Sequence, residues 1–173
     1  MTLLPEEALP FGSRMWFLFT GLALSGRVAD LLSTWIATPR LALEGNPIAR
    51  RLGWKWGIPL NLVVPLFLGC QPTLAVAVAT TSFLVAARNL QNAWLMRSMG
   101  EWQYRLWISE RLSETPKGLA LACFLGESFL MLLPGAGLLL FAGDRLVPMG
   151  VGLGMVAYAA AVAFFTSWAL LRH

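Results

Sequence analysis

The sequence predicts an all-α fold, a polytopic membrane helical bundle with about five transmembrane helices and a short interfacial helix. Of the 173 residues, 57% are hydrophobic and 13% are charged, whereas soluble domains carry about 25% charged residues. Several apolar runs also reach the ~20 residues that a helix needs to cross a bilayer. The length limits the chain to one compact bundle. Its single histidine and two cysteines argue against haem, structural zinc and a histidine-based catalytic triad.

Five apolar segments are expected to span the membrane. The first ends before Thr38-Pro39, because proline cannot continue a helix and disfavours helical backbone one residue earlier. The second contains Pro59 and Pro65, which predict a kinked or half-length helix. The turn Cys70-Gln71-Pro72 leads directly into the third, and Pro134-Gly135 predicts a kink in the fourth. The expected spans are 15–37, 52–68, 72–99, 118–141 and 146–171.

The segment between the third and fourth spans mixes tryptophan and tyrosine with charged residues. This composition predicts a helix lying on the membrane surface, over about residues 101–113. Three glycines at the start of the last span imitate a dinucleotide-binding loop. Without a preceding strand, they favour close packing of helices through small residues instead. These glycines are Gly150, Gly152 and Gly154.

Lysine and arginine lie between the apolar segments, mainly on one side of the predicted membrane. That side carries Arg40, Arg50, Arg51 and Lys55 after the first span, Arg97, Arg105, Arg111 and Lys117 after the third, and Arg172 at the end. The other side has Arg14 and Arg145. The positive-inside rule therefore predicts an inner-membrane protein with a cytoplasmic C-terminus and residues 1–14 as an extracytoplasmic segment. The distribution argues against a nucleic-acid partner.

Charged residues inside the first span mark the candidate site. Arg27, Asp30 and Thr34 fall at i, i+3 and i+7, so they share one helical face. An ionisable residue within a span is a functional-site hypothesis. The turn Glu44-Gly45-Asn46-Pro47 follows, and its proline restricts Asn46 to extended or turn conformations. We expect this acidic turn to fold back towards the charged face.

Polar residues of later spans are expected at the same depth. At about 1.5 Å per residue, Arg27, Asn89 and Glu127 lie roughly 10–15 Å from the cytoplasmic ends of their spans. Unpaired charge at a helix centre costs about 2.5–3.5 kcal/mol, which predicts pairing of the two arginines with the three carboxylates in one layer. The predicted cluster comprises Arg27, Asp30, Thr34, Glu44, Asn46, Arg88, Asn89, Asn92 and Glu127.

Two positive and three negative groups leave one negative charge in this cluster. A protonated carboxyl would account for it, since burial raises a carboxyl pKa, as would a cation or cationic ligand. Oxygen ligands of this kind suit Mg²⁺ or Ca²⁺, and Asp30 and Glu44 are the candidate metal ligands. No other cofactor is indicated. No catalytic residue is identified, because the sequence supplies no nucleophile.

Three roles for the cluster remain open. The polar side chains could lock the register of the helices. They could seat a small ligand in a non-catalytic subunit or ligand-binding membrane protein, with the lipid bilayer, other membrane subunits or further copies of the chain as partners. They could also form an intramembrane, metal-assisted active site for a lipid-linked or phosphate-bearing substrate. In that case Asp30 and Glu44 hold the metal or act as general base, and Arg27 or Arg88 neutralises a phosphate.

The pattern Asp30-x3-Thr34-x9-Glu44-x-Asn46-Pro47 resembles the domain of unknown function 5658 family, small multi-pass membrane proteins of bacteria and archaea. The resemblance covers about the first three spans and implies a bacterial or archaeal bundle of four or five helices. It implies no activity, because that family has none assigned. The chain departs from the pattern at Leu41-Ala42-Leu43, where a glycine would usually precede the glutamate, and in its extra Pro39.

Overall fold

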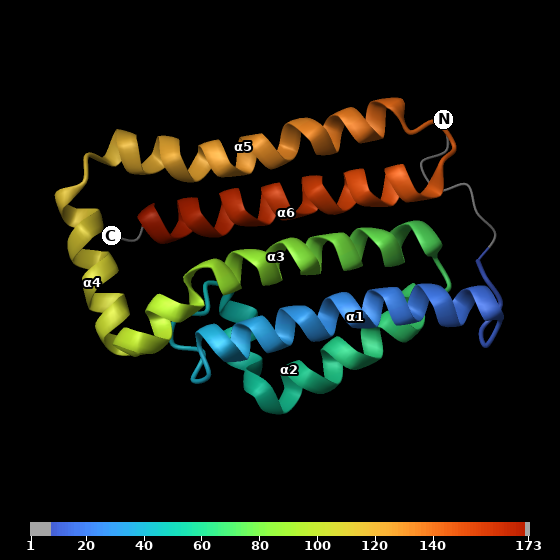
Figure 1. Cartoon of the computed structure of the whole chain (residues 1–173), viewed down its shortest axis with the longest axis horizontal. Coiled ribbons are helices and arrows are strands. Elements are labelled where there is room, and N and C mark those ends of the chain that lie inside the picture. The colour runs from blue at the N-terminus through green and yellow to red at the C-terminus, as the bar shows by residue number, and fades with distance from the viewer. Residues whose placement is uncertain (1–7, 172–173) are drawn as a thin grey trace.

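The computed structural model describes residues 8–171, with side chains up to Trp168, as six helices and no strand. Residues 1–7 of the expected extracytoplasmic segment, and Arg172, lie outside the described residues. The all-α prediction is confirmed. The helices are α1 (Arg14–Ala37), α2 (Pro47–Leu68), α3 (Pro72–Met99), α4 (Glu101–Glu114), α5 (Lys117–Phe141) and α6 (Leu146–Leu171) (Figure 1).

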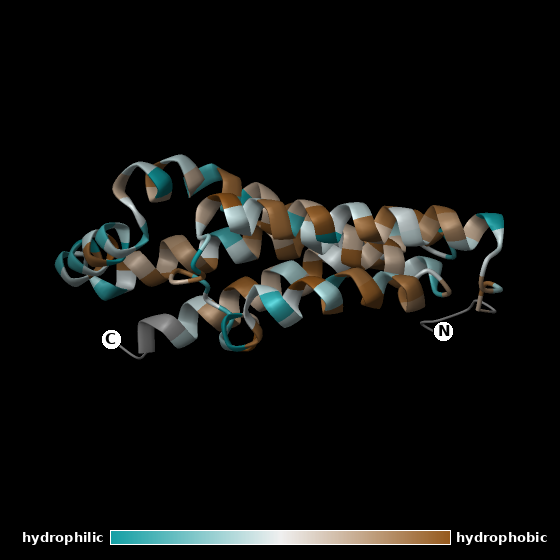
Figure 2. Ribbon diagram, turned by 90° about the horizontal axis from the view of Figure 1, so that it is seen from below, coloured by the Kyte–Doolittle hydropathy of each residue, from teal (hydrophilic) through white to brown (hydrophobic). Residues whose placement is uncertain are grey.

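Four of these helices, α1, α3, α5 and α6, are long and apolar enough to cross a membrane. They lie side by side along the long axis of the molecule, while α2 runs obliquely back along α1 and α4 crosses one end (Figure 1). Apolar residues dominate the middle of the long helices, and hydrophilic residues are frequent at the end where α4 lies (Figure 2). The arrangement indicates a helical, multi-pass membrane protein. The expected count of five spans is not confirmed, because α2 is not among the four.

The first helix and the loop after it follow local sequence signals. Ser13 caps α1, its side chain accepting a hydrogen bond from the backbone of Trp16 at 3.1 Å. The helix ends at Ala37, before Thr38-Pro39. The helix therefore ends where Pro39 predicts its end.

The second helix differs from the prediction at two points. It begins at Pro47, five residues before the expected start, because Asn46 caps it by accepting hydrogen bonds from the next turn and proline suits the first helical position. The break inside α2 lies at Gly53, with φ 61° and ψ −171°, and not at Pro59 or Pro65. Glycine adopts this left-handed conformation without the Cβ clash that other residues meet.

Small residues bring α3 into close contact with both of its main neighbours. A Cβ on Gly26 of α1 would lie 2.9 Å from Ala79 Cα, and one on Gly154 of α6 would lie 2.6 Å from the Ala77 carbonyl oxygen. The Thr81 hydroxyl, 2.9 Å from both carbonyl oxygens, bonds Ala77 and Gly154 across the α3–α6 contact. The prediction of small-residue packing at the start of the last helix therefore agrees with the structure. α5 packs extensively against α6 alone among the described helices.

Candidate functional site

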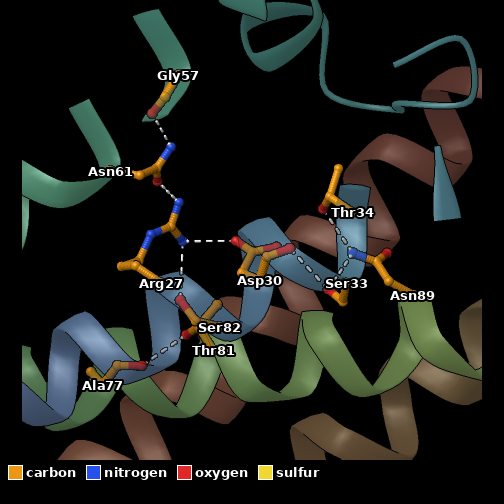
Figure 3. Close-up of polar contacts among 10 residues, drawn as sticks. All are labelled: Arg27, Asp30, Ser33, Thr34, Gly57, Asn61, Ala77, Thr81, Ser82 and Asn89. Atoms are coloured by element: carbon orange, nitrogen blue, oxygen red, sulfur yellow. Dashed lines mark hydrogen bonds and ion pairs between the residues drawn. The ribbon is translucent and has the colours of Figure 1, made fainter. Parts of the chain in front are cut away.

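Arg27 lies on the face of α1 that meets α2 and α3 (Figure 3). Its Nη1 is 3.0 Å from Asp30 Oδ2 and also donates to Ser82 Oγ at 3.0 Å. Its Nη2 donates to Asn61 Oδ1 of α2, and the Asn61 amide is oriented by donating to the Gly57 carbonyl at 2.7 Å. The guanidinium therefore joins three helices through one carboxylate and two neutral oxygens.

A second set of polar contacts lies one to two turns further along α1. The Asn89 side chain of α3 donates to Ser33 Oγ at 3.2 Å and to Thr34 Oγ1 at 3.0 Å (Figure 3). The Ser33 hydroxyl donates to the Asp30 carbonyl oxygen at 2.9 Å. Ser33 and Ser82 are almost completely buried, so these contacts belong to the α1–α3 interface.

The acidic turn after α1 folds back towards the charged face. Glu44 lies close enough to Asp30 for their carboxylates to interact electrostatically, although 14 positions separate them in the sequence. Within the turn, the Asn46 backbone N–H donates to Glu44 Oε1 at 2.8 Å. Asn46 itself serves as the cap of α2. The turn thus brings a second carboxylate within electrostatic range of Asp30, while its asparagine starts the next helix.

Glu101, the first residue of α4, holds the beginning of the same loop. Its carboxylate accepts hydrogen bonds from the Thr38 hydroxyl at 2.7 Å, the Arg40 backbone N–H at 2.8 Å and the Ala42 backbone N–H at 2.9 Å. Burial disfavours its charged form, but these three hydrogen bonds and the charge of Arg40 outweigh that effect and hold the pKa of Glu101 below its ordinary value. The loop is therefore fixed by an ionised carboxylate from outside it.

Arg88 and Glu127 form a separate group on the other side of α3. Arg88 Nη2 is 3.5 Å from Glu127 Oε2, and the Tyr158 hydroxyl of α6 donates to Glu127 Oε1 at 3.0 Å. Consecutive helical residues point about 100° apart, so Asn89 faces α1 while its neighbour Arg88 reaches α5. Within residues 8–168, Arg88 forms no ion pair with Asp30 or Glu44.

The single layer expected from the sequence is therefore two groups. The Arg27 cluster contains Arg27, Asp30, Ser33, Thr34, Glu44, Asn61, Ser82 and Asn89, and the Arg88 group contains Arg88, Glu127 and Tyr158. Asn92 joins neither group and is exposed on α3. Its side chain makes no hydrogen bond in the described part of the chain.

The sequence did not identify five residues that belong to these contacts. Asn61 is a lone amide in the otherwise apolar second half of α2, a signal that could have identified it. Ser33, Ser82 and Tyr158 carry no distinguishing pattern, since such residues are common in spans. Glu101 begins the predicted surface helix, and nothing in the sequence connects it to a loop about 60 positions earlier.

Asp30 and Glu44 supply the oxygens suited to a cation in the Arg27 cluster. The described residues contain no group of three or more His, Cys, Asp or Glu side chains arranged to hold a metal ion. A metal bound here would therefore need ligands beyond the two carboxylates, such as the hydroxyl of Thr34 or water.

Two apolar grooves lie apart from the Arg27 cluster. One of about 530 Å³ is lined by α5 and α6, and one of about 330 Å³ is lined by Leu52, Trp56 and other residues of α2. Neither groove is lined by a charged residue, so neither extends the polar site.

Comparison with known proteins adds no relative: no family model, no curated protein and no solved structure matches this chain.

Proposed function

We propose that this chain is a multi-pass protein of the bacterial or archaeal inner membrane that crosses the bilayer five times, with its N-terminus outside and its C-terminus inside. The support for the fifth crossing is that α1 and α3 run in the same direction along the bundle, so α2 returns the chain between them (Figure 1). Trp16 Nε1 donates to the Leu66 carbonyl at 3.0 Å, which joins the end of α2 to the start of α1. The support for the orientation is the excess of basic residues on the α4 side.

Within that membrane, the protein works as a non-catalytic, small-ligand-binding subunit, and the Arg27 cluster is the ligand seat. The observation that carries this proposal is the charge balance of the cluster. Asp30 and Glu44 interact electrostatically, and within residues 8–168 the Arg27 guanidinium pairs with Asp30 while Glu44 forms no ion pair. The remaining members are neutral amides and hydroxyls. One negative charge is therefore left for a small cation to balance.

The Arg88 group supplies an internal comparison. There, one arginine meets one glutamate and a tyrosine donates to the same carboxylate, so the charges balance without a ligand. A purely structural ion pair between helices needs nothing more. The Arg27 cluster differs by its second carboxylate, which the loop delivers from outside the helix.

The resemblance to the domain of unknown function 5658 family is part of this proposal. Its support is that Asp30, Thr34 and Glu44, three residues of the shared pattern, gather in the Arg27 cluster, while Asn46 and Pro47 start α2. The pattern then describes one site and the turn that completes it.

The proposal is tested by cation-dependent stabilisation of the full chain in detergent. A ligand present at a hundred times its Kd stabilises the folded state by about 2.7 kcal/mol. Thermal unfolding is measured with Mg²⁺, Ca²⁺ and a protonated primary amine as probes, each at matched ionic strength. We expect a saturable rise in Tm for at least one probe in the wild type, and its loss in Asp30→Asn and Glu44→Gln.

Glu110→Gln is the matched control, because the Glu110 side chain is exposed on α4 and forms no hydrogen bond or ion pair among the described residues. It should respond as the wild type does. Without ligand, Glu44→Gln should unfold at a temperature equal to or above that of the wild type, because it removes the repulsion with Asp30. A wild type that no probe stabilises, or a Glu44→Gln variant that responds normally, would refute the proposed ligand seat.

A further inference from the structure

α4 is attached to the bundle mainly through its first residue. The helix crosses the end of the bundle (Figure 1) and packs only slightly against α3, from which Gly100 separates it with φ 81°. None of its residues is buried. The hydrogen bonds of Glu101 to the loop are therefore its main connection to the part of the chain that carries Glu44.

The loop in turn depends on Glu101. Leu41 adopts φ 56°, a left-handed conformation that costs a non-glycine residue roughly 1–2 kcal/mol. On either side of it, the backbone N–H groups of Arg40 and Ala42 point to the Glu101 carboxylate at 2.8 and 2.9 Å. Backbone N–H groups that converge in such a turn form an anion-binding concavity. Here the anion is a side chain of another helix, and it stabilises the strained turn.

The loop also has a second point of contact with Glu101. The Thr38 hydroxyl donates to Glu101 Oε2 at 2.7 Å and accepts from the Leu43 backbone N–H at 3.2 Å. Leu43 directly precedes Glu44. The hydrogen bonds therefore run from the α4 carboxylate through Thr38 to the residue beside the second carboxylate of the Arg27 cluster.

We propose that Glu101 is a positioning residue: it fixes the loop over residues 38–46 so that Glu44 stays beside Asp30, and it makes the ligand seat depend on the placement of α4. The inference rests on the proposed function for its consequence, since the positioned carboxylate is the one that the cation needs. When α4 is displaced from the end of the bundle, the three loop groups that donate to the Glu101 carboxylate lose their hydrogen-bond acceptor. The Leu41 turn then relaxes and Glu44 moves away from Asp30.

A spin label on the loop measures this directly. A Cβ at Gly45 meets nothing within 4 Å, so Gly45→Cys accepts a nitroxide label in a background that carries Cys70→Ala and Cys123→Ala. The mobility of the label is read from its electron paramagnetic resonance spectrum. We expect an immobilised component that Glu101→Ala removes and that the matched control Glu110→Ala leaves in place.

A second label separates positioning from general destabilisation. Gly137 of α5 also has open space at its Cβ, and a label at Gly137→Cys should be unaffected by Glu101→Ala, whereas loss of the fold would mobilise both labels. Should Glu101→Ala not yield folded protein by circular dichroism, Glu101→Gln replaces it. That variant keeps one acceptor oxygen and should mobilise the loop label partly.

The cation response gives the consequence for binding. Glu101→Ala should weaken the binding of the stabilising cation by about 10- to 100-fold. This is the usual cost of losing a residue that orients a metal-ligating side chain. An immobilised loop label in the Glu101 variants overturns the positioning role whatever the cation does. A mobilised label in a protein that no cation stabilises leaves the positioning role standing and refutes only the proposed function.

Discussion

The contact of α3 with α6 depends on the absence of a side chain at Gly154. A Cβ there would lie 2.6 Å from the Ala77 carbonyl oxygen and 2.6 Å from Thr80 Cβ, well inside the ordinary contact distance of 3.4 Å. A backbone oxygen cannot rotate away as a side chain can. Gly154→Ala therefore forces the two helices apart and weakens the hydrogen bond from Thr81 to the Gly154 carbonyl.

The size of the effect can be worked out against a control glycine. Overpacking a close contact costs about 1–3 kcal/mol, and an interhelical hydrogen bond in a membrane protein contributes about 0.6 kcal/mol. Replacing glycine by alanine within a helix stabilises the helix by about 1 kcal/mol. Gly137→Ala obtains the same gain with nothing within 4 Å of its Cβ. The two variants should therefore differ in stability by roughly 2–4 kcal/mol, with Gly154→Ala the less stable.

Unfolding by sodium dodecyl sulfate in mixed micelles, followed by far-ultraviolet circular dichroism, measures this difference. Both variants replace a helical glycine by alanine, so the propensity term cancels between them. Equal stability of Gly154→Ala and Gly137→Ala would show that α3 and α6 do not approach each other as closely as described.

Two further predictions concern local contacts. A Cβ at Gly69 would lie 1.9 Å from Thr20 Oγ1, a buried hydroxyl without a hydrogen-bond partner in the described part of the chain. Gly69→Ala should therefore cost about 1–3 kcal/mol and adding Thr20→Ala should recover most of it, whereas purely additive effects in thermal unfolding would contradict this contact. The pKa of Glu101 is lowered from an ordinary 4.5, so its contribution to stability is present above that value and is lost only as the pH falls through the lowered pKa. A spin label at Gly45 should stay immobilised down to about pH 5 and loosen below the ordinary glutamate pKa, and a transition above it would exclude Glu101 as the titrating group.

The ends of the helices could be predicted where neighbouring residues determine them. Proline sets the end of α1 and the start of α3 through steric rules that involve one or two positions. The break in α2 was not predictable in this way, because Pro59, Pro65 and Gly53 all weaken a helix. The structure places the break at Gly53, where φ is 61°.

The same distinction applies to the site. The pair of Arg27 and Asp30 follows from a spacing of three on one helix and needs no knowledge of the fold. Arg88 and Asn89 could not be assigned to partners, since the sequence does not say which helix packs on which face of α3. Glu101 meets the loop because α4 crosses the end of the bundle, a feature of the tertiary arrangement alone.

The slight packing of α4 also bears on how the protein is assembled in the cell. The first three helices and the last two meet where α6 packs on α3, and Arg88 and Glu127 also link α3 to α5. During translation, α1, α2 and α3 would thus leave the ribosome as a nearly complete three-helix unit before α5 and α6 are synthesised. Two polypeptides cut within α4 and produced together should find each other in the bilayer and rebuild the molecule.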